Sequence, residues 1–464
     1  MCVGRARYPF DLEWVEGALV EEVRRLLAGK TLYAPPSIEY VPLLYNPLYF
    51  WIAAGLSRVF GAEAFTLRLV SIVSTCAAFA LLFTLVWREK RGVVAASCSA
   101  GFYAATYSSS GGWFDLGRVD SLCVALCLAA IAVARRATSR RAVAAAAVFS
   151  ALAFATKQNA LILLPSIAAG LWMLRGCRVA LEYLTAATLL VVTIVLSLDA
   201  ASDGWYLFYA FTMPRQHPLS PEFYLHFWTT ELLPKSPIAL VFGAFFFATT
   251  TAATRKVRSF YAAVVASLLG AAYVSRIHSW SFVNDLMPAH AALALLFGLG
   301  MPEGPDESDV RWGKLGRLAY VLAALQFVLA WEDVRHWIPS VKDRDEGQRV
   351  LAAIRALPGD VLVSDHAHLA VQAGKASMAH EMAIIDVMRM DHDVRGAQAM
   401  LRGSIERAYR NRRFSAVVTD DVFPVWKELT DYYRPAPAWF VYDRSALVAR
   451  TGWPMRPLKA FVPR

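Results

Sequence analysis

The sequence has few charged residues for its length. Of its 464 residues, 18% are charged and 57% are hydrophobic, and the mean hydropathy is +0.40. Soluble domains typically carry about 25% charged residues. The deficit falls in long apolar runs, so the composition excludes an ordinary soluble protein and predicts a polytopic membrane protein.

The cysteines form no recognisable pattern, and the sequence has neither an internal repeat nor a low-complexity segment. Five of the six cysteines lie in or beside apolar segments, and none lies in the C-terminal third. No disulfide framework is therefore indicated. Cys123 and Cys127 share a helix face, but they have no histidine or acid beside them and are interpreted as packing residues.

Ten apolar runs approach the length of about 20 residues that is needed to cross a bilayer. The runs are 65–87, 92–109, 119–135, 141–156, 159–175, 179–198, 236–252, 259–275, 286–301 and 315–331. The net charge of +10 comes mainly from arginine and lysine clusters in every second connecting loop. Such loops face the cytoplasm, so the alternate loops are predicted to face the periplasm or the cell exterior. This charge pattern also argues against a nucleic-acid partner.

The first 64 residues are predicted to form a re-entrant segment on the outer side. Pro47–Phe60 is apolar but short, and as a span it would put the preceding residues on the cytoplasmic side. We interpret it as an interfacial helix, with Tyr49, Phe50 and Trp51 among the lipid headgroups. No signal peptide precedes this segment, so a first transmembrane helix is expected to be missing from the reading frame.

Beyond about residue 333 the composition becomes that of a soluble domain. A helical pattern at 345–357 and strand-like runs at 360–364 and 415–419 predict a small α/β unit on the outer side. The predicted fold is therefore an all-α polytopic membrane bundle, residues 65–332, with a small C-terminal α/β soluble domain, residues 333–464.

The stretch from Tyr8 to Lys30 contains the first candidate catalytic carboxylates. Asp11 is predicted to cap a helix whose apolar stripe is Leu12, Val15, Leu19, Val23 and Leu26. Glu16 projects from inside that stripe, and Glu13 lies on its edge. A carboxylate on a packed face is costly unless it is paired or used, and burial raises its pKa toward that of a general base. The alternative is a solvated amphipathic helix.

Further ionisable residues lie at the predicted outer ends of the apolar runs. Asp120 opens the third run, and Lys157 is the charge between the fourth and fifth runs. Ionisable groups at membrane level usually mark functional sites. Asp115 and Arg118 are three residues apart and are expected to pair or to mark the interface. In the C-terminal domain, Asp365, His366, His368 and His380 match no zinc spacing and are assigned ordinary surface and capping roles.

Together these segments resemble the GT-C polyprenyl-phosphate-dependent glycosyltransferases of the bacterial family 39 type. This group includes protein O-mannosyltransferases and lipid A aminoarabinose transferases. The resemblance extends over roughly residues 8–330 and is carried by EGALVEEVRRLLAGKTLY (16–33), YNPLYFWIAAGLSRVFGAEAFTLRLVS (45–71), RVDSL (118–122), TKQ (156–158) and NDLMPAHAALAL (284–295).

The resemblance implies a catalytic acid in the first outer loop. The family motif there is usually Asp-Glu, and Glu16 resembles its glutamate, but the aspartate position holds Val15. The carboxylate is then supplied by Glu13, by Asp11 or by Glu16 itself. Asp120 resembles the acidic residue of the second outer loop and is assigned to the catalytic group as well.

The resemblance also implies a site for the lipid phosphate. Lys157 resembles the family lysine that follows the next helix, whereas Asn46 stands before Pro47 where the aminoarabinose transferases have a lysine. Phosphate recognition therefore rests on Lys157, Arg215, His217 or Arg276. The full set assigned to substrate binding is Tyr45, Asn46, Arg118, Lys157, Arg215, His217 and Arg276.

The implied reaction is inverting transfer of a sugar from a polyprenyl-phosphate donor to a hydroxyl group of a lipid, glycan or protein. It would take place at the outer face of the bacterial inner membrane, and the clustered acids permit a divalent metal without requiring one. A lipid or sugar transporter or flippase is the competing class, but transporters concentrate charges near the midplane, often in inverted repeats. A degenerate glycosyltransferase that serves as a scaffold is a third possibility.

Overall fold

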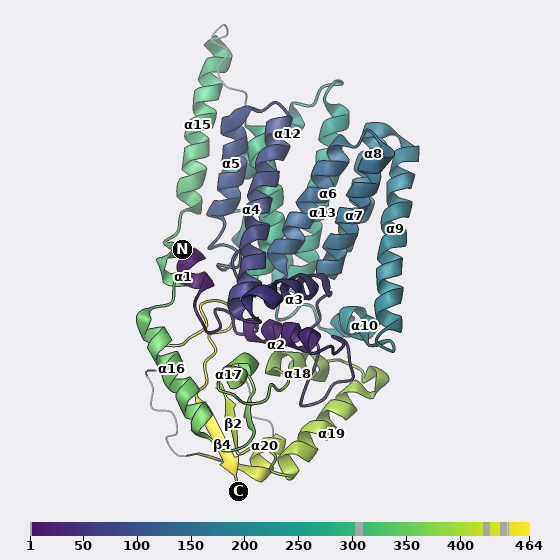
Figure 1. Cartoon of the computed structure of the whole chain (residues 1–464). Helices are drawn as coiled ribbons and strands as arrows, with labels where there is room; N and C mark the ends of the chain where they lie inside the picture. The colour runs from purple at the N-terminus through teal and green to yellow at the C-terminus, as the bar shows by residue number, and fades with distance from the viewer. Residues whose placement is uncertain (1, 302–309, 421–426, 437–442, 444) are drawn as a thin grey trace.

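The computed structural model describes residues 2–301, 310–420, 427–436, 443 and 445–464. Two parts are evident: a bundle of long helices and a smaller domain that covers one end of it (Figure 1). Side chains are described for all of these residues except 2, 3, 310–315 and 427.

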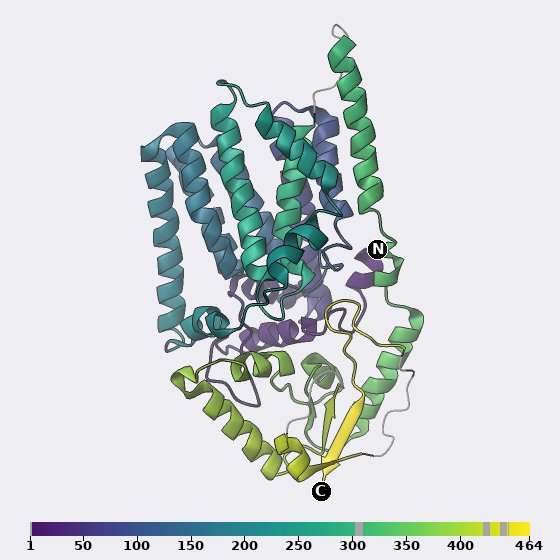
Figure 2. The same cartoon turned by 180° about the vertical axis from the view of Figure 1, so that it is seen from behind.

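Each of the ten predicted apolar runs contains a helix of the bundle (Figures 1 and 2). The helices are α4 (Ala64–Arg88), α5 (Gly92–Ala105), α6 (Asp120–Arg136), α7 (Arg140–Thr156), α8 (Leu163–Arg175), α9 (Cys177–Ala200), α12 (Pro237–Ala248), α13 (Arg255–Arg276), α14 (Met287–Gly300) and α15 (Val310–Ala330). Within the described residues, four helical segments are long and apolar enough to cross a membrane: α4, α9, α13 and Val283–Gly300. Phe223–Leu232 and Pro237–Ala248, bent by 97°, make a fifth if they count as one span.

Helix α14 lies in the middle of the bundle. Nearly all of its residues are buried, and it packs against α5, α12 and α13. A helix that is hydrophobic all round is expected to be enclosed by its neighbours. Its glycines permit a close approach, since a Cβ atom at Gly300 would lie 1.9 Å from the carbonyl oxygen of Phe242. Helix α9, in contrast, exposes a row of leucines at the edge of the bundle, as expected for a lipid-facing surface.

Several short elements cross the end of the bundle that faces the small domain (Figure 1). They are α1 (Cys2–Ala6), α2 (Glu16–Leu27), α3 (Leu48–Phe60), η1 (Gln158–Ile162), α10 (Trp205–Leu207), η2 (Phe208–Thr212), η3 (Pro214–Gln216), α11 (Phe223–His226), η4 (Phe227–Leu232) and η5 (Val283–Leu286). Helix α3 lies across the bundle axis, as an interfacial helix would. Trp51 is exposed, but Tyr49 and Phe50 are 0% and 1% exposed. The expected headgroup position is wrong for these two rings, because they pack inward against the first loop and α4.

The helices alternate in direction, so that the basic connectors gather at the opposite end of the bundle. We call the end covered by the small domain the site end. All of the predicted site residues lie at the site end, as the charge alternation required. Its assignment to the outer side of the membrane remains a prediction.

The small domain is an α/β unit. Its elements are η6 (Val334–Trp337), α16 (Val341–Ala356), β1 (Val361–Val363), α17 (Ala367–Gln372), α18 (Glu381–Met388), η7 (Val394–Gly396), α19 (Ala397–Arg410), β2 (Ala416–Thr419), α20 (Lys427–Tyr432), β3 (Tyr433–Pro435) and β4 (Lys459–Pro463). The sheet order is β1-β2-β4-β3, with β1 parallel to β2 and the other pairs antiparallel. The two predicted strands are confirmed as β1 and β2, whereas β3 and β4 were not predicted.

Candidate active site

Helix α2 begins later than the apolar pattern indicated. Its first residue is Glu16 and its N-cap is Val15, so the prediction that Asp11 caps the helix is wrong. Asp11 instead accepts a hydrogen bond from Nδ1 of His366, at 2.9 Å. Glu13 lies in the turn before α2, and the two glutamates therefore do not share a helix face.

Glu16 is held in a buried ion pair. Nε of Arg68 donates to Oε1 at 2.8 Å, and Nη2 donates to Oε2 at 2.5 Å. The backbone N–H groups of Leu12 and Gly117 donate to the same carboxylate, at 3.0 and 2.7 Å. Both side chains of the ion pair are 0% exposed. Glu16 thus joins the first loop to α4 and to the loop before α6.

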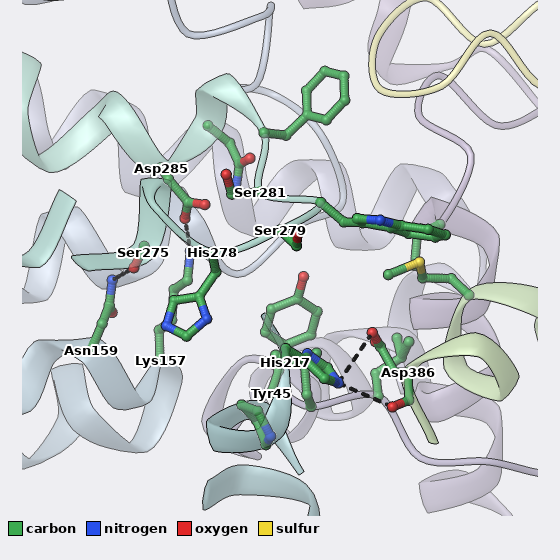
Figure 3. A pocket seen from close by; sticks show the side chains of 18 of the residues that line it. Tyr45, Lys157, Asn159, His217, Ser275, His278, Ser279, Ser281, Asp285 and Asp386 are labelled. Atoms are coloured by element: carbon green, nitrogen blue, oxygen red, sulfur yellow. Dashed lines mark hydrogen bonds and ion pairs between the residues drawn. The ribbon is translucent and has the colours of Figure 1, made fainter. Parts of the chain in front are cut away.

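A cavity of about 480 Å³ opens at the site end between the bundle and the small domain. Figure 3 shows side chains from both parts facing it. Six of the predicted site residues line it: Glu13, Tyr45, Arg118, Lys157, Arg215 and His217. The other five are absent from its lining: Asp11, Glu16, Asn46, Asp120 and Arg276.

Glu13 is the carboxylate of the first loop that reaches the cavity. Its Oε2 accepts hydrogen bonds from Nη1 of Arg118, at 3.0 Å, and from the backbone N–H of Val15, at 3.2 Å. Nη2 of Arg118 donates to the hydroxyl group of Tyr45 at 2.5 Å. Burial raises the pKa of Glu13 to about 7, although the guanidinium of Arg118 opposes the shift. The expected pairing of Arg118 with Asp115 is wrong, because Asp115 pairs with Arg5 at 3.2 Å.

Lys157 lies between two carboxylates. Helix α7 ends at Thr156, and the extended backbone of Lys157 turns its side chain to the cavity wall. Its Nζ is 2.8 Å from Oδ1 of Asp120 and 2.8 Å from Oδ1 of Asp285, the second of which is drawn in Figure 3. Asp120 also accepts hydrogen bonds from Asn284, at 3.0 Å, and from the Trp113 indole, at 3.1 Å.

The Lys157 ammonium affects whether Asp120 and Asp285 could bind a divalent metal ion. It occupies the space between the two carboxylates, where a cation shared by both would have to lie. Within the described residues there is no group of three or more His, Cys, Asp or Glu side chains that could hold a metal ion. The residues present therefore do not fit a divalent cation, and we derive no step through one.

Arg215 and His217 both line the cavity but differ in charge and in their contacts. Arg215 is exposed, lines the cavity and has no ion-pair partner in the part of the chain that the structure describes. Nη2 of Arg389 approaches Nδ1 of His217 at 2.7 Å, and Nε2 of His217 is 3.0 Å from the carbonyl oxygen of Asp386. A guanidinium only donates, so the ring is neutral with its proton on Nε2. Burial also lowers the pKa of His217. Of these two residues, Arg215 is therefore the one that carries a positive charge.

Arg276 and Asn46 hold loops rather than lining the cavity. Nη2 of Arg276 lies 2.6 Å from Oε1 of Glu231, and Nη1 donates to the Ser281 hydroxyl at 2.8 Å. The amide of Asn46 donates to the carbonyl oxygen of Phe154 and accepts from the hydroxyl of Tyr206, at 3.1 Å.

The small domain contributes residues that the sequence patterns did not reveal. Asp386 of α18 and Arg389, the C-cap of α18, line the cavity, as does Trp453 of the segment before β4. Asp386 and Arg389 pair at 2.7 Å with i, i+3 spacing, which in a sequence looks like an ordinary surface ion pair. Trp280, between α13 and η5, also lines the cavity and was not predicted.

A histidine and two acids join the small domain to the first loop and α4. Nδ1 of His368 is 2.9 Å from Glu21, and its Nε2 is 3.1 Å from Glu63. Two carboxylates facing the two ring nitrogens favour the doubly protonated ring. These hydrogen bonds outweigh the effect of burial and raise the pKa of His368 to about 9.

We expect this contact to weaken at alkaline pH. Because the pKa of His368 is higher in the folded protein than its ordinary value of 6.5, its contribution is complete below pH 6.5 and is lost as pH rises through 9. A thermal-shift titration of the purified protein should show the melting temperature falling between pH 6.5 and 9. His368→Gln should flatten that part of the curve, and a fall of equal size in His368→Gln would contradict the assignment.

Residues 42–199 match a family described as dolichyl-phosphate-mannose-protein mannosyltransferase. No curated protein sequence matches the chain. Among the solved structures that are similar to it, we describe three, all at low sequence identity.

Two of these are crystal structures of ArnT from Cupriavidus metallidurans. The apo state gives a TM-score of 0.58 at 14% identity, with 87% of each chain covered. The form bound to undecaprenyl phosphate gives 0.59 at 14% identity, with 96% of this chain and 93% of that chain covered. The third is the archaeal oligosaccharyltransferase AglB from Archaeoglobus fulgidus, in complex with an inhibitory peptide and a dolichol-phosphate. It gives 0.52 at 11% identity, with 89% of this chain and 66% of that chain covered.

The resemblance drawn from the sequence is therefore confirmed: this chain is a polytopic membrane protein with the GT-C glycosyltransferase fold.

Proposed function

We propose that the protein transfers a sugar from a polyprenyl-phosphate donor to an acceptor hydroxyl, with inversion at the sugar C1 atom. One observation carries the proposal: a single cavity at the site end combines a buried carboxylate, Glu13, with two cations, Lys157 and Arg215. The donor is assigned by analogy with ArnT, which has been solved with undecaprenyl phosphate. The cavity is placed on the outer side of the membrane, as the charge alternation of the loops predicts.

Glu13 has the properties of a general base. A pKa of about 7 keeps a large share of the carboxylate ionised near neutral pH while leaving it basic enough to accept a proton. Both of its protein hydrogen bonds in the described residues go to Oε2, which leaves Oε1 for the acceptor hydroxyl. Arg118 fixes the orientation of the carboxylate, and the Tyr45 hydroxyl fixes Arg118.

Lys157 and Arg215 are assigned to the donor phosphate. In the transfer, Glu13 takes the proton of the acceptor hydroxyl as its oxygen bonds to C1, and the bond from C1 to the phosphate oxygen breaks. The leaving polyprenyl phosphate gains negative charge, which nearby cations stabilise. Because Asp120 and Asp285 already neutralise Lys157, we assign a large part of this stabilisation to Arg215.

Binding of undecaprenyl phosphate tests the two cations. A hydrogen bond to a charged group contributes about 1.5–3 kcal/mol, so Arg215→Ala should weaken binding by about 10–150-fold. Lys157→Met should weaken it at least as much, because it leaves two carboxylates beside the phosphate without a counter-charge. Lys157→Arg should retain part of the affinity.

The matched control is Arg335→Ala. Arg335 also lies at the site end, but its side chain is 86% exposed and does not line the cavity. Its variant should bind like the wild type. Wild-type affinity in both Arg215→Ala and Lys157→Met would remove these residues from the phosphate site, and failure of the wild type to bind undecaprenyl phosphate would overturn the proposed donor.

A further inference from the structure

The side of the cavity formed with the small domain has a different chemical character from the side with Lys157. Two indole rings, Trp280 and Trp453, line it with their centroids 6.2 Å apart and their planes at 50°. The Arg389 guanidinium lies 5.1 Å from the centre of the Trp280 ring. The Asp386 carboxylate, paired with Arg389 at 2.7 Å, also lines this side. We call these four residues the tryptophan wall.

Trp280 has a left-handed backbone conformation, which residues other than glycine rarely adopt. Its φ is 69°, and its side chain is nevertheless 42% exposed. A bulky residue in the left-handed region is an outlier, and such strain persists where the surrounding structure enforces it, often at ligand sites. The surroundings do so here: Ser279 donates its N–H to the Pro218 carbonyl at 2.9 Å, and its own carbonyl accepts from Arg389 at 3.3 Å. Ser279 and Ser281, on either side of Trp280, face the cavity in Figure 3.

The segment that carries the other indole is bound to the first loop. The N–H groups of Arg450 and Thr451 donate to the Leu12 carbonyl at 2.8 and 3.2 Å, which binds this segment to the first loop. A Cβ atom at Gly452 would lie 3.2 Å from Oε1 of Glu13. Trp453 is the next residue in the chain and lines the same cavity as Glu13.

We propose that the tryptophan wall is the acceptor subsite and that the acceptor is a carbohydrate; this inference rests on the proposed function. A pyranose ring has an apolar C–H face that stacks on an indole and a rim of hydroxyl groups that a guanidinium and a carboxylate bind. Recognition of an extended peptide by strand addition needs a free strand edge, and none of the described β-strand residues lines the cavity. The wall thus holds the sugar ring while one of its hydroxyl groups meets Oε1 of Glu13.

Isothermal titration of the purified full-length protein, saturated with undecaprenyl phosphate, tests this assignment. The probes are cellobiose, lactose and N,N′-diacetylchitobiose, with a threonine-containing decapeptide for comparison. We expect at least one disaccharide to bind the wild type and the decapeptide not to bind. Trp280→Ala and Trp453→Ala should each weaken that disaccharide about tenfold or more, as truncation of a central tryptophan in an interface does. Trp280→Phe should recover part of the affinity.

The matched control is Trp331→Ala. Trp331 lies at the site end and is 75% exposed, but it does not line the cavity. Undecaprenyl phosphate binding, measured on the same samples, shows that each variant is folded and should equal that of the wild type. The inference is overturned if the wild type binds undecaprenyl phosphate but no disaccharide, if both tryptophan variants bind the disaccharide as the wild type does, or if the decapeptide binds in its place. Loss of undecaprenyl phosphate binding by the wild type would overturn the proposed function itself.

Discussion

Glu13→Gln should lower the rate of sugar transfer by about 10²–10⁴-fold, the usual effect of removing a general base. Glutamine keeps the shape of the side chain and still accepts the hydrogen bond from Arg118, but the buried ion pair is lost, so thermal unfolding of the variant is measured alongside its rate. The measurement is transfer of radiolabelled sugar from polyprenyl phosphate to acceptor. Glu222→Gln, at an exposed position of the site end outside the cavity lining, is the control and should keep the wild-type rate.

The pH dependence supplies a second readout for the same residue. Because the base must be ionised to accept a proton, kcat/KM should rise with pH through about 7, the pKa to which burial raises Glu13, and then level off. Glu13→Gln should lose this rise. If Glu13→Gln transferred sugar at the wild-type rate with an unchanged pH profile, the catalytic carboxylate would have to be another residue.

Breaking the buried pair of Glu16 and Arg68 should cost about 3–5 kcal/mol of stability, because a charge is left without its partner where water does not reach. Arg68→Met should show this most clearly. It also removes the hydrogen bonds from the guanidinium to the carbonyl oxygens of Arg5, Tyr8 and Phe10. The measurement is the midpoint of thermal or denaturant unfolding in detergent.

Two comparisons isolate the ion pair. Glu16→Gln combined with Arg68→Met should cost less than the sum of the single changes, since neither charge is then stranded. Glu182→Gln removes the partner of Arg178, whose side chain is 78% exposed, and should cost no more than about 1 kcal/mol. If Glu16→Gln proved fully stable but inactive, Glu16 would have to be moved from the structural group to the catalytic one.

The helices of the bundle could be predicted from the sequence because each one is a continuous apolar run with charged residues at its ends. The same holds for the crosswise position of α3, which followed from its length and from the alternation of basic loops. The strands β3 and β4 could not be predicted. They are short, and their residues take the extended conformation through pairing with one another and with β2.

The two glutamates of the first loop show why the site was only partly predictable. The apolar spacing around Leu12 and Val15 fits a helix, which would place Glu13 and Glu16 on one face. What separates them is tertiary: Arg68 comes 52 residues after Glu16 and draws it into the protein, while Arg118, 105 residues after Glu13, holds that carboxylate at the cavity. The residues near each glutamate in the sequence do not indicate which arginine it pairs with.

The two indoles of the tryptophan wall could not be predicted for a similar reason. Trp280 and Trp453 come from segments 173 residues apart, and each looks like a single aromatic residue in a loop. The docking of residues 450 and 451 on Leu12 brings the segment of Trp453 to the cavity that Glu13 also lines. The lysine between the runs, in contrast, was identified because a lone charge at membrane level stands out in any sequence.

The docking of Arg450 and Thr451 on the carbonyl of Leu12 also bears on how the protein matures. Residues from the first and the last twentieth of the chain form adjacent walls of one cavity, so the bundle can insert into the membrane and pack long before the cavity is complete. A nascent chain whose ten helices are already in place still lacks the wall beside Glu13. Completion of the cavity thus depends on a segment that is synthesised after all ten helices of the bundle.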